Sequence, residues 1–191
     1  MNTAKQIPIT TYGMEILRKK TTPVKEIDSK LIGFIQDMFY TMTKASGIGL
    51  AAPQVNSGIS LAVVDLSEIE EYKSFKPLIL INPVVTEFHG KDTAEEGCLS
   101  IPDLRADVER HSEINLRYFD LNMNEINTEL KGFPARVVQH EIDHLNGILF
   151  TDLLPEEKKK EFKRKLTEIK KGRIEAEYPL RIHSGKNGYR M

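Results

Sequence analysis

The chain has 191 residues, 40% of them hydrophobic and 29% charged, and a formal net charge of −1. Its length suits one domain with a substantial core, and so small a net charge argues against binding to DNA or to a membrane surface. The longest apolar run, residues 78–85, is interrupted by Asn82 and Pro83, and it falls well short of the roughly 18 residues that cross a membrane. Residues 1–6 resemble neither a secretory signal nor a transit peptide, so we expect a cytoplasmic protein.

Residues 28–45 are predicted to form the first helix. Apolar side chains recur there at helical spacing, namely Leu31, Ile32, Ile35, Met38, Phe39 and Met42. This pattern is typical of a helix face that packs on a core. Asp28 or Ser29 is the expected N-cap, and Gly47 is the expected stop.

Short β-rich runs occupy the middle of the chain. They cover residues 59–66, 77–88, 106–109, 113–120 and 126–130, with polar turn residues between them. Because few helical segments separate these strands, we expect them to pair antiparallel.

Two more helices are predicted after the strands. The first covers residues 133–146 and is ended by Gly147. The second begins at Pro155, with acidic residues in its first turn and lysines in its last, near residue 171. Strands followed by helices predict an α+β fold, with antiparallel sheets packed around the helix 133–146 and a C-terminal helix beyond it.

The helix 133–146 contains the most informative motif of the chain, His140-Glu141-x-x-His144. Two histidines four residues apart lie on one helix face, so both imidazoles can bind the same divalent metal, with the carboxylate of Glu141 beside it. Such a metal activates water and polarises a carbonyl, while the glutamate moves the proton. The pattern indicates a metal-dependent hydrolase.

Cys98 is the predicted third metal ligand. Catalytic sites of this kind use three protein ligands, and the chain has one cysteine, in the segment Glu95-Glu96-Gly97-Cys98. A lone cysteine is usually a small buried hydrophobe. The carboxylates and the glycine before it favour instead an exposed loop or the edge of a strand.

A glycine-rich segment, Gly47-Ile48-Gly49-Leu50-Ala51-Ala52-Pro53-Gln54, precedes the predicted strands. It is not a dinucleotide-binding fingerprint, because a helix precedes it and Pro53 interrupts the helix that such a fingerprint needs after it. We interpret it as a loop where the backbone approaches a ligand closely and Gln54 offers an amide donor.

The three motifs, in this order and spacing, resemble those of the peptide deformylases, and the resemblance runs from about residue 7 to about residue 155. Residues 172–191 have weak periodicity, depart from the family's usual ending and are expected to form a tail that packs on the surface or is mobile. The resemblance implies one catalytic domain over residues 1–171. It also implies removal of the N-formyl group from the formyl-methionine of nascent polypeptides, with release of formate.

The resemblance further implies roles for individual residues. One divalent metal ion, most often Fe²⁺ in this family, with Ni²⁺, Co²⁺ or Zn²⁺ as substitutes, would be held by Cys98, His140 and His144. A metal-activated water, with Glu141 as general acid and base, would attack the formyl carbon. Gln54 and the backbone N–H of Leu99 match the donors that the family uses for the oxyanion.

Five residues are candidates for binding the substrate. Ile48 and Gly49 would border the peptide backbone, and Arg105 matches a family position near it, although a solvated arginine is the ordinary alternative. Phe133 and Val137, on the metal helix, would border the methionine side chain or else belong only to the core.

Other polar residues have weaker assignments. We expect Glu96 to orient the ligand segment through Arg110 or Arg105, and we interpret Arg136 as a departure from the apolar residue of some relatives. Asp143 would brace the helix or a ligand. His89, His111 and His183 are expected to be ordinary surface or turn residues.

Two competing functions fit the sequence less well. A metallopeptidase of the His-Glu-x-x-His class lacks its third ligand downstream of His144, and an inactive peptide-binding relative should have lost a site residue. The charged run from Glu156 to Lys171 is expected to be a solvated helix face, with transient contact to the ribosome as the functional alternative.

Overall fold

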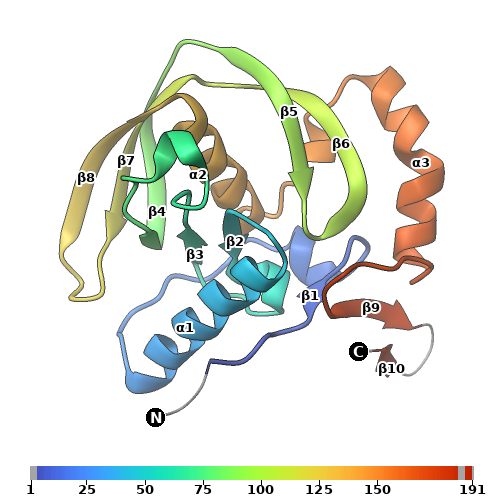
Figure 1. Cartoon of the computed structure of the whole chain (residues 1–191), viewed down its shortest axis with the longest axis horizontal. Coiled ribbons are helices and arrows are strands. Elements are labelled where there is room, and N and C mark those ends of the chain that lie inside the picture. The colour runs from blue at the N-terminus through green and yellow to red at the C-terminus, as the bar shows by residue number, and fades with distance from the viewer. Residues whose placement is uncertain (1–3, 185–187, 191) are drawn as a thin grey trace.

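The computed structural model of the chain describes residues 4–184 and 188–190, and side chains as far as residue 182. The α-helices are α1 (Ser29–Lys44), α2 (Gly132–Leu145) and α3 (Glu156–Lys170). The strands are β1 (Ile9–Thr10), β2 (Gly49–Ala51), β3 (Leu61–Val64), β4 (Leu78–His89), β5 (Asp92–Cys98), β6 (Ile101–Arg110), β7 (Glu113–Phe119), β8 (Glu125–Lys131), β9 (Leu180–Ser184) and β10 (Gly188–Arg190). Figure 1 shows α2 enclosed by strands and α3 on the outside. The predicted α+β class is confirmed.

The strands form three sheets. A five-stranded sheet has the order β2-β3-β4-β7-β8, and every pair in it is antiparallel, as predicted. Strands β5 and β6 form a separate antiparallel hairpin. In the third sheet β9 pairs antiparallel with β10 but parallel with β1, so the antiparallel expectation does not extend to the segment after α3.

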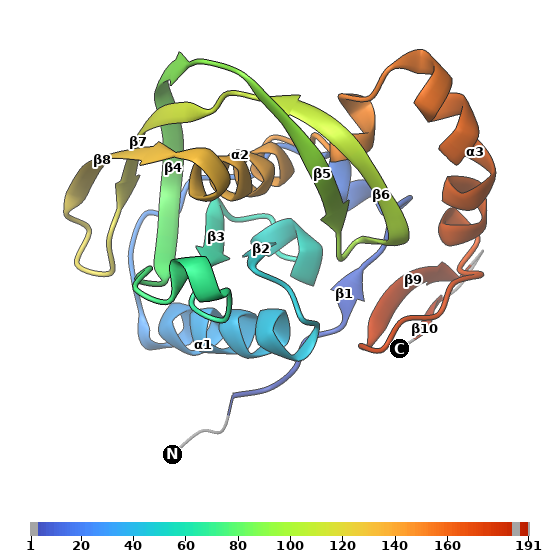
Figure 2. The same ribbon diagram turned by 45° about the horizontal axis from the view of Figure 1, so that its top comes forward.

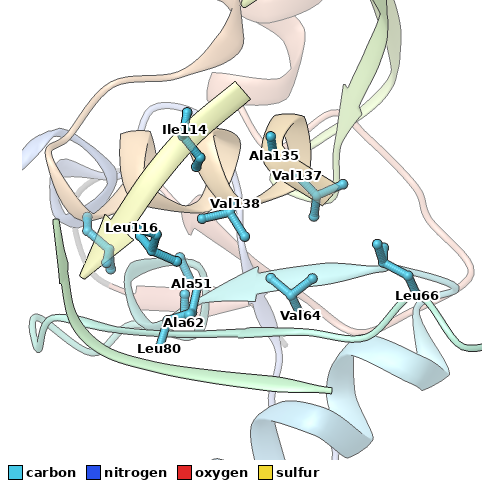
Figure 3. Close-up of a cluster of buried hydrophobic side chains, with 11 residues drawn as sticks. Ala51, Ala62, Val64, Leu66, Leu80, Ile114, Leu116, Ala135, Val137 and Val138 are labelled. Atoms are coloured by element: carbon cyan, nitrogen blue, oxygen red, sulfur yellow. The ribbon is translucent and has the colours of Figure 1, made fainter. Parts of the chain in front are cut away.

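Helices α1 and α2 cover opposite faces of the five-stranded sheet (Figure 2). Alternation along β3 divides its side chains between them: Leu61 and Val63 belong to the cluster with α1, and Ala62 and Val64 to the cluster with α2. Figure 3 shows this second cluster, in which Val138 and its neighbours on α2 face β2, β3 and β4. The helix that carries the metal motif is therefore held by a packed core.

The helix ends follow most of the sequence signals. The Asp28 side chain accepts a hydrogen bond of 2.8 Å from the Leu31 N–H, so Asp28 is the N-cap of α1. Gly147, at φ 76°, ends α2 as predicted. Two expectations were wrong in detail. Ser46, at φ 54°, takes the left-handed position after α1 instead of Gly47, and Pro155 precedes the first helical residue of α3.

Several strand bounds differ from the prediction. Strand β6 is longer than residues 106–109, β5 was not predicted, and Gly49–Ala51 is a strand inside the predicted glycine-rich loop. The short strand β2 is held by pairing with β3 and is wholly buried. Such pairing depends on a partner strand that is separate in sequence. A pattern within a few neighbouring residues therefore does not predict it.

Helix α3 packs on the β5–β6 hairpin. Its buried residues Phe162 and Ile169 lie in one cluster with Ile101 and Val108 of β6. After α3 the chain turns back, and Leu180 of β9 pairs with Ile9 of β1. Within the described part of the chain, no helix is both long and apolar enough to cross a membrane.

Candidate active site

His140 and His144 lie one turn apart on α2, and their ring centroids are 4.9 Å apart. Cys98 is the last residue of β5, and its Sγ lies 3.2 Å from Nε2 of His144. One ligand atom from each of the three residues lies within 4.8 Å of the others. Helix and hairpin thus bring together the three residues that the sequence predicted as ligands.

This cluster fits a divalent metal. A thiolate and two imidazoles are a donor set for iron, zinc, cobalt or nickel. Ligand atoms on one tetrahedral ion, at about 2.0 to 2.3 Å from it, lie about 3.5 Å from one another, close to the observed separation of Cys98 and His144. His140 uses its Nδ1 toward Glu96, at 3.0 Å, which leaves its Nε2 for a metal.

Glu96, on β5, is the hub of a buried charge network behind the ligands. Arg110 donates to both of its oxygens, at 2.5 and 3.0 Å, and Arg136 donates to Oε1 at 2.8 Å. Arg110 also donates to Asp143 at 2.8 Å. Although burial raises the pKa of Glu96, hydrogen bonds from His140 and Arg110 lower it to about 2. Glu96 therefore stays ionised and orients His140.

These contacts show which arginine binds Glu96 and what Arg136 does. The predicted contact of Glu96 with Arg110 is confirmed, whereas Arg105 is exposed and lies 3.5 Å from Glu95. Arg136 is buried and also donates to the Val108 carbonyl at 2.8 Å. Its other Nη donates to the Asp92 carbonyl at 2.8 Å, so its charge is used in holding α2 against β5 and β6.

The glycines of the Gly-x-Gly motif make room for two side chains of the site. A Cβ added to Gly49 would lie 2.3 Å from Oε1 of Glu141, and one added to Gly47 would lie 2.7 Å from Cδ1 of Leu99. Any larger residue at Gly49 would displace the carboxylate. The backbone therefore approaches two side chains of the site closely, while the predicted close approach to a ligand stays a prediction.

Gln54 is buried and points its amide group at the β5–β6 turn. Its Oε1 accepts from the Ala51 N–H at 2.8 Å, which turns its Nε2 toward Sγ of Cys98, at 3.5 Å, and Oγ of Ser100, at 3.4 Å. The amide donor therefore lies beside the metal ligands in a fixed orientation.

The pKa values of the three titratable site residues on α2 are shifted in different directions. Burial raises the pKa of Glu141 to about 7, against the lowering effect of His140 and Arg110. Burial also lowers the pKa of His144, whereas the hydrogen bonds of His140 with Cys98 and Glu96 outweigh burial and raise its pKa to about 10. Among the described residues, no side chain or backbone group bonds Oε2 of Glu141.

A cleft of about 880 Å³ opens beside the cluster. Its lining includes every predicted site residue except His144, namely Ile48, Gly49, Gln54, Cys98, Leu99, Arg105, Phe133, Val137, His140 and Glu141. Residues 175–178, which come after α3, also line it and were not predicted to do so. Tyr178 donates from its hydroxyl to the Leu99 carbonyl at 2.9 Å, a contact that no local signal indicates.

Two of the remaining histidines, His89 and His111, contribute no ligand to this cluster. His89 is exposed near Glu87, and the ring of His111 lies 3.0 Å from the Gly90 carbonyl. The side chain of His183 lies outside the described part of the chain. Within that part, the cluster of Cys98, His140 and His144 is the one group of three histidine, cysteine or acidic residues close enough together to hold a metal.

A family model described as polypeptide deformylase matches residues 6–160. The chain belongs to the polypeptide deformylase family. It is 44% identical to a peptide deformylase of Chlorobaculum parvum over 180 residues, which are 94% of this chain and 96% of that protein. The relatives' name and the match over most of the chain make it a peptide deformylase by family.

Solved structures of the family have the same fold. A peptide deformylase from Legionella pneumophila is 36% identical, with a TM-score of 0.79, and the match covers 87% of this chain and 96% of that one. A class I type b peptide deformylase from Acinetobacter baumannii, with Met-Ala-Ser bound, is 34% identical with a TM-score of 0.75; the match covers 80% of this chain and 100% of that one. Family membership supports a deformylating enzyme whose cluster can hold a metal.

Proposed function

We propose that this enzyme hydrolyses the formyl amide of N-terminal formyl-methionine on newly made polypeptides, giving formate and a free amine. One observation carries the proposal: the Cys98, His140 and His144 cluster lies beside a cleft that is lined by Cys98, His140 and the buried Glu141. The matches to peptide deformylases support the same reaction. Residues 1–171 would form the catalytic domain, and residues 172–191 a tail of which residues 175–178 complete the wall of the cleft.

The cofactor in this proposal is one Fe²⁺ ion on Cys98, His140 and His144, for which Zn²⁺, Ni²⁺ or Co²⁺ can substitute. A divalent cation on these ligands supplies Lewis acidity, which polarises a carbonyl oxygen and eases the deprotonation of water. The soft thiolate and two imidazoles support a transition metal over magnesium or calcium.

Glu141 is the proposed general acid and base. Its carboxylate accepts a proton from the attacking water and later donates it to the departing amine nitrogen. Two features support this role: Oε2 has no partner among the described residues, and burial raises the pKa of Glu141 to about 7. A group with such a pKa exchanges protons readily near neutral pH.

Gln54 and the Leu99 N–H are the proposed donors to the oxyanion that forms when water adds to the formyl carbon. Donors stabilise this charge best when they are already oriented before the reaction. The hydrogen bond of Gln54 with the Ala51 N–H supports such orientation, since it turns the amide NH₂ toward the cluster.

The substrate would lie along the cleft. Ile48 and Gly49 are proposed to border its backbone, Arg105 to contact it near the rim, and Phe133 and Val137 to border the methionine side chain. Their common position in the cleft lining supports these roles. The relative from Acinetobacter baumannii with Met-Ala-Ser bound supports a peptide that begins with methionine.

We place the enzyme in the cytoplasm, where a free thiol stays reduced and nascent chains emerge. The exposed basic residues of α3 are the proposed surface for transient contact with the ribosome. Lys160, Lys163 and Arg164 are exposed and, among the described residues, have no ion pair. A positively charged surface of this kind attracts the phosphate groups of ribosomal RNA.

The test compares formyl-Met-Ala-Ser with Met-Ala-Ser and acetyl-Met-Ala-Ser, using anaerobically purified enzyme of measured metal content. We expect formate from the first peptide, at a rate that follows the Fe²⁺ content, and no cleavage after methionine in any of the three. The iron enzyme should lose activity in air, whereas the nickel enzyme should keep it, because Ni²⁺ lacks the easy step to the trivalent ion. Cleavage of the Met-Ala bond would identify a peptidase instead.

A further inference from the structure

The turn between β5 and β6 is held from outside the hairpin at two consecutive carbonyls. The Leu99 carbonyl accepts from the Tyr178 hydroxyl at 2.9 Å, and the Ser100 carbonyl accepts from the Tyr12 N–H at 2.8 Å. This turn comes directly after Cys98 and contains the Leu99 N–H. Its orientation therefore determines where that N–H points.

Tyr178 reaches the turn from the segment after α3. The position of that segment is set by β9, since Leu180 pairs with Ile9 and the Pro179 carbonyl accepts from the Ile9 N–H at 2.8 Å. Tyr178 is half-buried in the wall of the cleft. Burial raises the pKa of Tyr178 above its ordinary value, so its hydroxyl keeps the proton that it donates. The family model ends at residue 160, before this segment begins.

We propose that Tyr178 is a positioning residue that holds the Leu99 carbonyl and thereby helps to aim the Leu99 N–H at the oxyanion. The carbonyl that Tyr178 binds and the N–H that would bind the oxyanion flank the same Cα, in two successive peptide units. Because the Ser100 carbonyl is also held, fixing the Leu99 carbonyl restrains the tight turn as a whole, and with it the direction of the N–H. An oxyanion donor acts through its orientation before the reaction, so a looser turn lowers the rate without weakening substrate binding. This inference rests on the proposed function.

Tyr178→Phe tests the proposal in the metal-loaded enzyme, because it removes the hydroxyl and keeps the ring that packs in the cleft wall. Tyr118→Phe is the matched control: Tyr118 is a half-buried tyrosine on β7 that does not line the cleft. With formyl-Met-Ala-Ser, kcat of Tyr178→Phe should fall roughly 3- to 30-fold while KM changes less than about twofold. Tyr118→Phe should keep both constants.

Amide hydrogen exchange at Leu99 gives a second measurement that does not depend on turnover. We expect exchange to quicken in Tyr178→Phe and to stay unchanged in Tyr118→Phe, with similar melting temperatures for both variants. An unchanged kcat, or an effect on KM alone, overturns the proposal and leaves Tyr178 as part of the cleft wall. If the wild type released no formate from any formyl peptide, the proposed function would fail instead, and the exchange result would still show whether Tyr178 holds the turn.

Discussion

Helix α2 has 14 residues and helix α3 has 15, and both are rich in polar side chains, but only α2 buries them. Arg136, Gln139, His140, Glu141 and His144 are all buried on α2. None of the charged side chains of α3 is buried. Most of its ion pairs join neighbours on the helix surface, such as Lys158 with Glu161 at 2.8 Å, and one reaches the hairpin, joining Lys165 to the exposed Asp103 of β6 at 3.3 Å.

The difference lies in where the partners come from. On α2 the charged groups meet Glu96 of β5 and Arg110 of β6, so each contact depends on the whole fold. Removing one member of a buried pair costs about 3 to 5 kcal/mol, because the other charge stays buried. Exposed pairs contribute about 0.2 to 1 kcal/mol each. The charged side chains of α2 therefore hold the site together, whereas those of α3 mainly keep the helix surface solvated.

Glu141→Gln should give the largest effect. It removes the charge on α2 that is proposed to act in the reaction and leaves the charges that bind Glu96 and Arg110 in place. Formate release should fall about 10² to 10⁴-fold, since the same group both accepts and donates a proton. Metal content should stay unchanged and the melting temperature should stay unchanged or rise, because a neutral amide replaces a buried carboxylate whose Oε2 has no partner among the described residues. Near-normal turnover at full metal occupancy would remove Glu141 from the mechanism.

Arg110→Met should break the buried network next to α2. Glu96 and Asp143 lose their shared partner, so the free energy of unfolding should fall by about 3 to 5 kcal/mol in denaturant titrations. Metal affinity should also fall, by about 10- to 100-fold, because Glu96 orients His140. Lys91→Met is the control, since it removes an exposed ion pair with Glu109 from the same hairpin. Equal losses in the two variants would contradict the comparison.

Gly49→Ala should act on α2 from the neighbouring strand β2. The added methyl group overlaps Oε1 of Glu141, at 2.3 Å, and a displacement of about 1 Å at a catalytic group can cost as much as about 10²-fold. We expect kcat to fall about 10- to 100-fold with the metal retained. Gly33→Ala on α1 is the control, because its Cβ meets nothing within 4 Å. A normal kcat would mean that Glu141 relaxes without loss of function.

Glu161→Gln on α3 should have the smallest effect. It removes the exposed ion pair with Lys158 and leaves the buried Phe162 and Ile169 in place. The free energy of unfolding should change by no more than about 0.5 kcal/mol, and formate release should stay normal. A loss above about 1 kcal/mol would show that α3 also depends on its charges, and the contrast with α2 would then disappear.

The helices and most strands of the central sheet were predictable because their signals are local. Spacing along α1 and α2 needs only neighbours within a turn or two, and so does the pairing of His140 with His144 on one helix face. Strand β5 was missed because Ala94, Glu96 and Cys98 do not form an apolar alternation. The buried Glu96 is stabilised there by Arg110 and Arg136, which lie 14 and 40 residues away.

The sequence by itself determined the α+β class, the metal motif, its cysteine partner and the family to which they pointed. Only the tertiary structure decided that Arg110, rather than Arg105, binds Glu96, that Arg136 lies inside the network, and that residues 175–178 line the cleft. The reason is physical: helix periodicity and motif spacing act over a few residues. The partner of a buried charge, and the pairing of β9 with β1 across about 170 residues, depend on how the whole chain packs.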